Sequence, residues 1–83
     1  MSVEQKVIAV LDGVLNLKGR GTAFTSGSPL LGHLPELDSM AVVSLLSELE
    51  ARFGFTIEDD EVDGSTFATV GSLTQFVRFK LDH

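Results

Sequence analysis

The chain has 83 residues, 43% of them apolar, and a formal net charge of -6. This length predicts a single domain over residues 1–83 with one modest core, which leaves little room for a deep catalytic cleft. The acidic balance argues against nucleic acid as a partner, because its recognition draws on clustered Lys and Arg.

The composition also restricts the chemistry and the cellular setting. Because there is no cysteine, disulfides, zinc thiolate sites and thiol nucleophiles are excluded. The two histidines, His33 and His83, are too few for a histidine-rich metal site, and we expect no metal. The chain shows no signal peptide and no apolar run of about 20 residues, the length needed to span a membrane. We expect a cytoplasmic monomer without stable membrane insertion.

Residues 3–17 are predicted to form the first helix, with Ser2 as its N-cap. Apolar residues recur there at steps of three and four: Val3, Val7, Val10, Leu11, Val14 and Leu17. Residues 18–37 lack a sustained period and are predicted to form a long loop, with a helical turn near Leu30. Four leucines predict that this loop lies on the core: Leu30, Leu31, Leu34 and Leu37.

The second helix is predicted over residues 39–53. At about 100° per residue, one sector of the helix gathers five apolar residues that should face the core: Val42, Leu45, Leu46, Leu49 and Phe53. Met40 and Val43 fall outside this sector, with Ser47 beside them. Gly54 follows at the position where a helix end favours a left-handed residue.

The last third of the chain is predicted to hold an extended connector over residues 55–63 and a short helical turn over residues 65–69. Thr69 should cap a final helix over residues 70–81. Four residues of this helix are expected to face inward: Leu73, Phe76, Val77 and Leu81. Three main helices and one short helix make an all-α bundle.

Asp38 and Ser39, at the start of the second helix, allow three interpretations. Either residue is a favourable helix cap. A catalytic serine would need a base and an oxyanion hole, and the sequence lacks Gly-x-Ser-x-Gly around Ser39. The histidine nearest in sequence that could serve as this base is His33, in the loop before Ser39. A serine exposed at a helix start suits the third interpretation, in which another enzyme modifies it.

An acidic stretch over residues 59–64, "DDEVDG", resembles the first half of an EF-hand loop. The pattern fails at its twelfth position, where Val70 replaces the bidentate Glu. We therefore expect no specific calcium site.

The segment "LDSMAVVSLLSELEARFG" resembles the acyl carrier protein family, whose signature is Asp-Ser-Leu at the start of the second helix. Met40 stands here in place of the Leu. The resemblance extends to the first amphipathic helix, the long loop, the acidic connector and "FATVGSLTQFV", which is similar to the family's Phe-x-Thr-Val-x-x-Leu pattern. It implies an acyl-carrier-like four-helix bundle with a short helix III.

The resemblance also implies a carrier and not an enzyme. Ser39 would hold 4′-phosphopantetheine, which a phosphopantetheinyl transferase supplies from coenzyme A with Mg²⁺, and Asp38 would help to engage that transferase. The arm would carry an acyl group as a thioester. Further partners would be an acyl- or aminoacyl-loading ligase and enzymes of the ketosynthase or acyltransferase type.

The sequence departs from the family pattern at the surface beside Ser39. Members that serve fatty acid biosynthesis usually carry a row of acids along the second helix, whereas residues 41–44 here are uncharged. We expect Met40, Val43, Ser47 and Glu48 to dock partners. The departure favours a specialised carrier of lipid, polyketide or other biosynthesis. An aminoacyl or peptidyl carrier and an unmodified interaction bundle are the alternatives.

Overall fold

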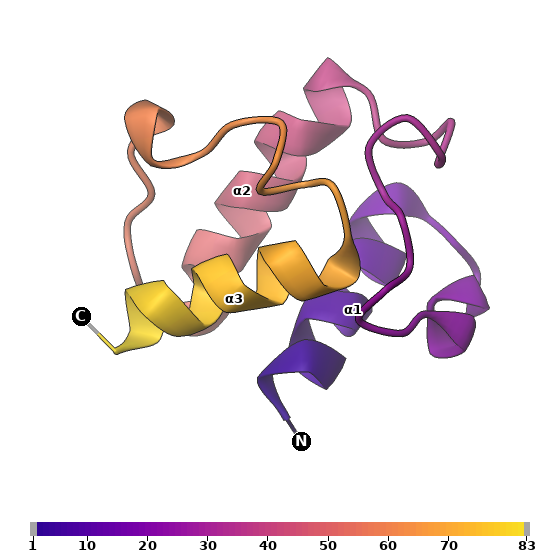
Figure 1. Ribbon diagram of the computed structural model, residues 1–83, viewed down its shortest axis with the longest axis horizontal. Coiled ribbons are helices and arrows are strands. Elements are labelled where there is room, and N and C mark those ends of the chain that lie inside the picture. The colour runs from indigo at the N-terminus through magenta and orange to yellow at the C-terminus, as the bar shows by residue number, and fades with distance from the viewer. Residues whose placement is uncertain (1, 83) are drawn as a thin grey trace.

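The structure, a computed structural model, describes residues 2–82, and this part of the chain contains α-helices and no β-strand. The α-helices are α1 (Val3–Leu15), α2 (Ser39–Phe53) and α3 (Val70–Leu81), and the short 3-10 helices η1 (Arg20–Ala23) and η2 (Asp59–Glu61) lie in the connections. α1 packs against both α2 and α3 (Figure 1). None of the helices in residues 2–82 is long and apolar enough to cross a membrane. The predicted all-α architecture with three main helices is confirmed.

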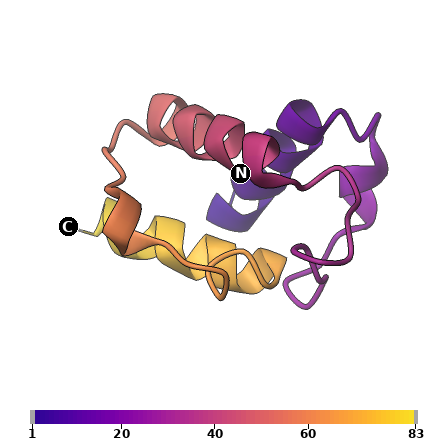
Figure 2. The ribbon, with the colours of Figure 1, turned by 90° about the horizontal axis from the view of Figure 1, so that it is seen from above.

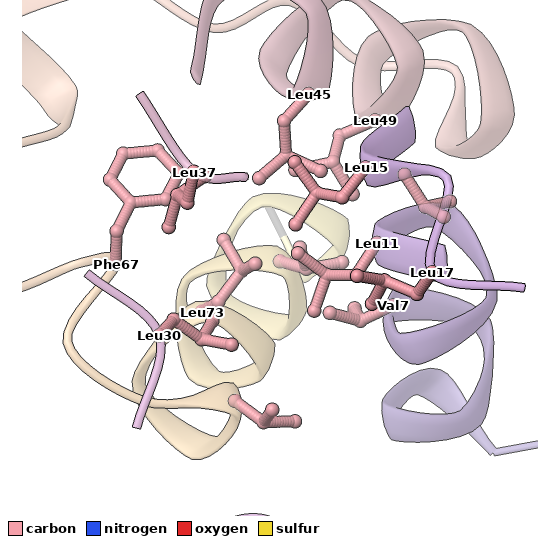
Figure 3. Packing of buried hydrophobic residues seen from close by; sticks show 13 residues of the cluster. Val7, Leu11, Leu15, Leu17, Leu30, Leu37, Leu45, Leu49, Phe67 and Leu73 are labelled. Carbon is pink, nitrogen blue, oxygen red and sulfur yellow. The ribbon is translucent and has the colours of Figure 1, made fainter. Parts of the chain in front are cut away.

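The core lies between the three helices, and the long loop contributes to it. Figure 2 shows α2 and α3 along opposite sides of the molecule. Side chains from all three helices meet Leu30, Leu37 and Phe67 between them (Figure 3). The buried apolar set is Val7, Val10, Leu11, Leu15, Leu17, Leu30, Leu37, Leu45, Leu49, Phe67, Val70, Leu73 and Val77.

α1 is capped at both ends by its own sequence. The Ser2 hydroxyl accepts from the Gln5 N–H at 3.1 Å, and the Gln5 side chain accepts from the Ser2 N–H, which forms a capping box. At the other end, Asn16 adopts a left-handed conformation with φ of 56°. The helix therefore ends at Leu15, two residues before the predicted end, although Leu17 is still buried.

Hydrogen bonds hold the long loop near its start and again at Leu30. The Asp12 carboxylate accepts from the Gly19 N–H at 3.2 Å and from the Gly21 N–H at 3.0 Å. A Cβ at Gly21 would lie 2.8 Å from the Asp12 Oδ2 atom, so a larger residue there would require the Asp12 side chain to move. Further along, the Leu30 N–H donates to the Ala68 carbonyl at 2.9 Å. The loop is thus tied to α1 and to the segment before α3.

The loop leucines follow the prediction with one exception. Leu30 and Leu37 are buried and Leu34 is partly buried, but Leu31 is 43% exposed. Leu31 lies in the turn that follows Leu30, and its N–H donates to the Phe67 carbonyl at 3.0 Å. A hydrogen-bonded turn follows Leu30, as expected, where the Leu34 N–H donates to the Leu30 carbonyl.

α2 has the predicted bounds, 39–53. Gly54 ends it with φ of 77°, as expected for a left-handed cap. Leu45 and Leu49 are fully buried, and the rest of the predicted inward set, Val42, Leu46 and Phe53, is partly buried against the core.

The short helix expected over residues 65–69 is a hydrogen-bonded turn, and η2 lies earlier in the connector. The Asp63 carboxylate accepts from the Ser65 N–H at 2.9 Å and from the Thr66 N–H at 3.3 Å. These side-chain bonds satisfy backbone donors at the start of the turn and stabilise it. The same bonds direct the Asp63 carboxylate toward the backbone of its own loop. Val70, at the twelfth position of the calcium pattern, is buried.

α3 has the predicted start and end. The Thr69 hydroxyl accepts from the Ser72 N–H at 3.0 Å, as expected for the cap. Leu73 and Val77 are buried, but Leu81 is 44% exposed, so its predicted inward orientation is wrong. Leu81 is the last residue of α3, and this end of the helix lies at the edge of the bundle, next to the C-terminus (Figure 1).

Candidate functional site

Asp38 and Ser39 have different tasks at the start of α2. Asp38 is the N-cap, with extended backbone, and its Oδ1 accepts from the Ala41 N–H at 2.8 Å. Ser39 is the first helical residue and is exposed. Its hydroxyl has no hydrogen-bond partner within residues 2–82. The cap therefore does not use the serine, and the Ser39 hydroxyl is available at the surface.

The position of Ser39 favours a negatively charged substituent. The first backbone N–H groups of a helix point outward without intrahelical partners, and the helix dipole adds partial positive charge there. Asp38 satisfies the Ala41 N–H and leaves the rest of the first turn open. A phosphate on the Ser39 oxygen would lie at the end of the helix that stabilises anions.

Nothing in the described chain activates Ser39 as a nucleophile. His33, the one histidine that precedes it, is exposed in the loop, and its backbone N–H donates to the Leu30 carbonyl. Among residues 2–82, no side chain that could act as a base is bonded to the Ser39 hydroxyl. The geometry suits a residue on which another protein acts.

The predicted docking residues divide into two groups. Met40 is 76% exposed and Val43 is 63% exposed, and Ser47 is exposed one turn further along the same side. Glu48 is partly buried, and its carboxylate accepts from the Arg52 Nε at 2.9 Å. Glu48 is thus held toward Arg52, apart from the side that carries Met40.

Two contacts, one before the start of α2 and one near its end, were not predicted. Arg20 in η1 pairs with Glu36, two residues before Asp38, and the Arg20 hydrogen bond lowers the pKa of Glu36. Glu50 accepts from the Ile57 N–H at 2.7 Å and so fixes the start of the connector. Both contacts join residues seven or more positions apart in the chain, so no local sequence pattern predicts them.

The described hollows of the surface lie away from Ser39. One, of about 970 Å³, lies between α1 and the segment over residues 24–26. The other, of about 260 Å³, lies between α1 and the end of α2. Ser39 lines neither of them.

Comparisons with known proteins agree with this geometry. Residues 35–77 match the family model described as "Phosphopantetheine attachment site". The chain is 28% identical over 81 residues to an acyl carrier protein of Exiguobacterium sp., covering 98% of this chain and 100% of the relative. The solution NMR structure of a holo acyl carrier protein from Nitrosomonas europaea superposes with a TM-score of 0.92, at 48% identity and full coverage of both chains.

The fold and the matched segment define a carrier domain with a phosphopantetheine attachment site. The chain belongs to the acyl carrier protein family, as its resemblance implied. It is accordingly a carrier protein and not an enzyme, and its prosthetic group is covalently bound phosphopantetheine.

Proposed function

We propose that Ser39 is the attachment residue and that the protein carries acyl groups as thioesters on the arm. The observation that supports this best is the exposed Ser39 hydroxyl, which lies at the first position of α2 and is not used by the cap. The matched family model spans this residue. The holo state named for the Nitrosomonas europaea structure gives the same expectation for this chain.

The residues present fit the group. Attachment requires an accessible hydroxyl and room for a phosphodiester, and Ser39 and its neighbour Met40 are both exposed. The N–H groups of the first turn of α2 would stabilise the negative charge of a phosphate attached to Ser39. When bound, the group supplies the thiol that the cysteine-free sequence lacks.

The loading reaction would take place on a transferase. The Ser39 oxygen would form a bond to the phosphorus of the coenzyme A pyrophosphate that carries pantetheine. The P–O bond to the other phosphate would break, and adenosine 3′,5′-bisphosphate would leave. The hydroxyl proton would pass to a base of the transferase, because residues 2–82 provide none at Ser39. Asp38, exposed beside Ser39, would engage the transferase.

The pathway we propose is a specialised lipid, polyketide or related biosynthesis in the cytoplasm. The first two turns of α2 carry no acid, in contrast to the acidic row expected of a carrier in fatty acid synthesis. A loading ligase and enzymes of the ketosynthase or acyltransferase type would be its partners, with Met40, Val43, Ser47 and Glu48 proposed as contact residues. The same observation leaves an aminoacyl or peptidyl carrier as the second candidate.

Intact-mass analysis tests the attachment. The protein is incubated with a broad-specificity phosphopantetheinyl transferase, coenzyme A and Mg²⁺. We expect the wild type and a Ser26→Ala control to gain one phosphopantetheine mass, because Ser26 is an exposed loop serine remote in sequence from α2. Ser39→Ala should gain none while keeping its helical circular dichroism, because Asp38 supplies the cap. A wild type that stays unmodified refutes the proposal.

A further inference from the structure

Arg20 connects the end of α1 to the residues just before the attachment site. Its Nε donates to the Leu17 carbonyl at 3.1 Å, and a terminal guanidinium nitrogen pairs with Glu36 Oε2. Leu17 is itself buried in the core, so the carbonyl that receives the Nε bond is held in place. Arg20 thus bonds the chain just after α1 to a residue 16 positions further along.

The backbone around Arg20 is fixed from both sides. Its neighbours Gly19 and Gly21 donate their N–H groups to the Asp12 carboxylate of α1, at 3.2 Å and 3.0 Å. Hydrogen bonds to a carboxylate are stronger than those between neutral groups. An arginine whose backbone and Nε are both held loses less conformational entropy when it forms an ion pair. Arg20 is therefore a preorganised partner for Glu36.

Glu36 connects Arg20 to the start of α2. Its side chain is 30% exposed, its Oε1 is buried without a hydrogen bond to another described residue, and the Arg20 hydrogen bond lowers its pKa. The Glu36 carbonyl accepts from the Asp38 N–H at 3.2 Å, and Leu37 between them is buried. Without Arg20, the half-buried carboxylate would lose the positive charge that faces it and would be better solvated if it turned outward. That movement would release the backbone next to the Asp38 cap.

We propose that Arg20 is a positioning residue for the modification of Ser39. Through Glu36 it keeps the last loop residues in one conformation, so that Asp38 and Ser39 are presented to the transferase together. The inference rests on the proposed function and adds a residue outside α2 on which the loading reaction depends. Arg20 acts on the conformation of the free carrier and contacts no reacting atom.

This role has a characteristic kinetic effect. If only a fraction of the carrier has the loop in the binding conformation, the apparent affinity for the transferase falls by that fraction. The chemical step in the bound complex is unaffected, so KM should rise while kcat stays the same. A partly exposed ion pair has a modest strength, which sets the expected rise in KM for Arg20→Gln at about two- to fivefold.

The test measures phosphopantetheine transfer to the full chain by the broad-specificity transferase. Arg20→Gln, Glu36→Gln and the double variant should raise KM by the same factor, because each of them removes the same ion pair. Lys80→Gln is the matched control, since it also removes one positive charge and breaks an ion pair, that with Glu61 at 2.7 Å. The C-terminal end of α3, which carries Lys80, lies away from the first turn of α2 (Figures 1 and 2), so this variant should keep the wild-type KM.

The amide signals of the unmodified protein give a second readout that does not depend on the transferase. In ¹H–¹⁵N spectra, Arg20→Gln should shift the signals of Asp38 and Ser39, although both residues are distant from it in sequence. Lys80→Gln should leave these two signals in place. A loss of overall stability alone would not produce this difference between two folded variants.

The outcomes separate the two proposals. The positioning role is overturned if Arg20→Gln keeps a KM within about 1.5-fold of the wild type, if it lowers kcat instead, or if Lys80→Gln raises KM equally. A double variant with a higher KM than either single variant would mean that Arg20 contacts the transferase directly, which also overturns it. If Arg20→Gln does not fold, the KM and amide spectrum of Glu36→Gln decide in the same way. A wild type that is never modified refutes the proposed function instead, while the amide signals still show whether Arg20 orders the start of α2.

Discussion

Asp38 is predicted to have two separable roles, and two substitutions distinguish them. Asp38→Asn keeps a side-chain oxygen that accepts from the Ala41 N–H, a bond of 2.8 Å in the structure, but removes the charge. Asp38→Ala removes both. Loss of an exposed N-cap costs about 1 kcal/mol. For a domain of this size, that corresponds to a fall in the melting temperature of about 4–8 °C.

The assay pairs thermal denaturation, followed by circular dichroism, with the rate of phosphopantetheine transfer. We expect Asp38→Ala to melt several degrees lower and Asp38→Asn to melt close to the wild type, because Asn is as good a cap as Asp. Both variants should be modified slowly, because the carboxylate that engages the transferase is absent from both. If Asp38→Asn is modified at the wild-type rate, Asp38 is only a cap and its proposed role in recognition is wrong.

Burial and pH provide the remaining predictions. Leu45→Ala should cost about 2–5 kcal/mol in urea denaturation, because Leu45 is fully buried. Leu46→Ala, at the adjacent and half-buried position, should cost clearly less, and equal losses would contradict the assigned helix face. Hydrogen bonds from Lys80 to Glu61 and from Ser65 to Asp63 lower the pKa of both carboxyl groups below their ordinary values of 4.5 and 3.8. Their stabilisation is therefore complete above these values and is lost as the pH falls through the lowered pKa. The melting temperature of the wild type should fall below about pH 4.5 more than that of Glu61→Gln, and parallel curves would refute the contribution of Glu61.

Patterns within one element predicted α2 well. The steps of three and four residues, the Asp-Ser start and Gly54 are local signals, and the structure confirms the bounds, the buried leucines and the exposure of Met40 and Val43. The attachment motif is equally local. Its chemistry could therefore be expected from the resemblance before the fold was known.

The predictions that failed depended on contacts distant in sequence. Leu31 is exposed in the turn through which the loop bonds to the segment before α3, and Leu81 is exposed at the last position of α3. The ion pair between Arg20 and Glu36 spans 16 positions. Helical periodicity describes the sides of one helix and contains no information on which other segment covers each side.

The ties of the long loop have a consequence for how the chain folds. The Leu30 N–H donates to the Ala68 carbonyl, and the Gly71 N–H donates to the Ser26 carbonyl at 2.7 Å. Each of these bonds joins residues roughly 40 positions apart. The chain loses conformational entropy when such a long segment is closed, before the contacts that compensate for this loss have formed. Small helical proteins with mostly local contacts fold fastest. This chain should reach its native state more slowly than a plain three-helix bundle, with the loop ahead of Ser39 ordered only when α3 has docked.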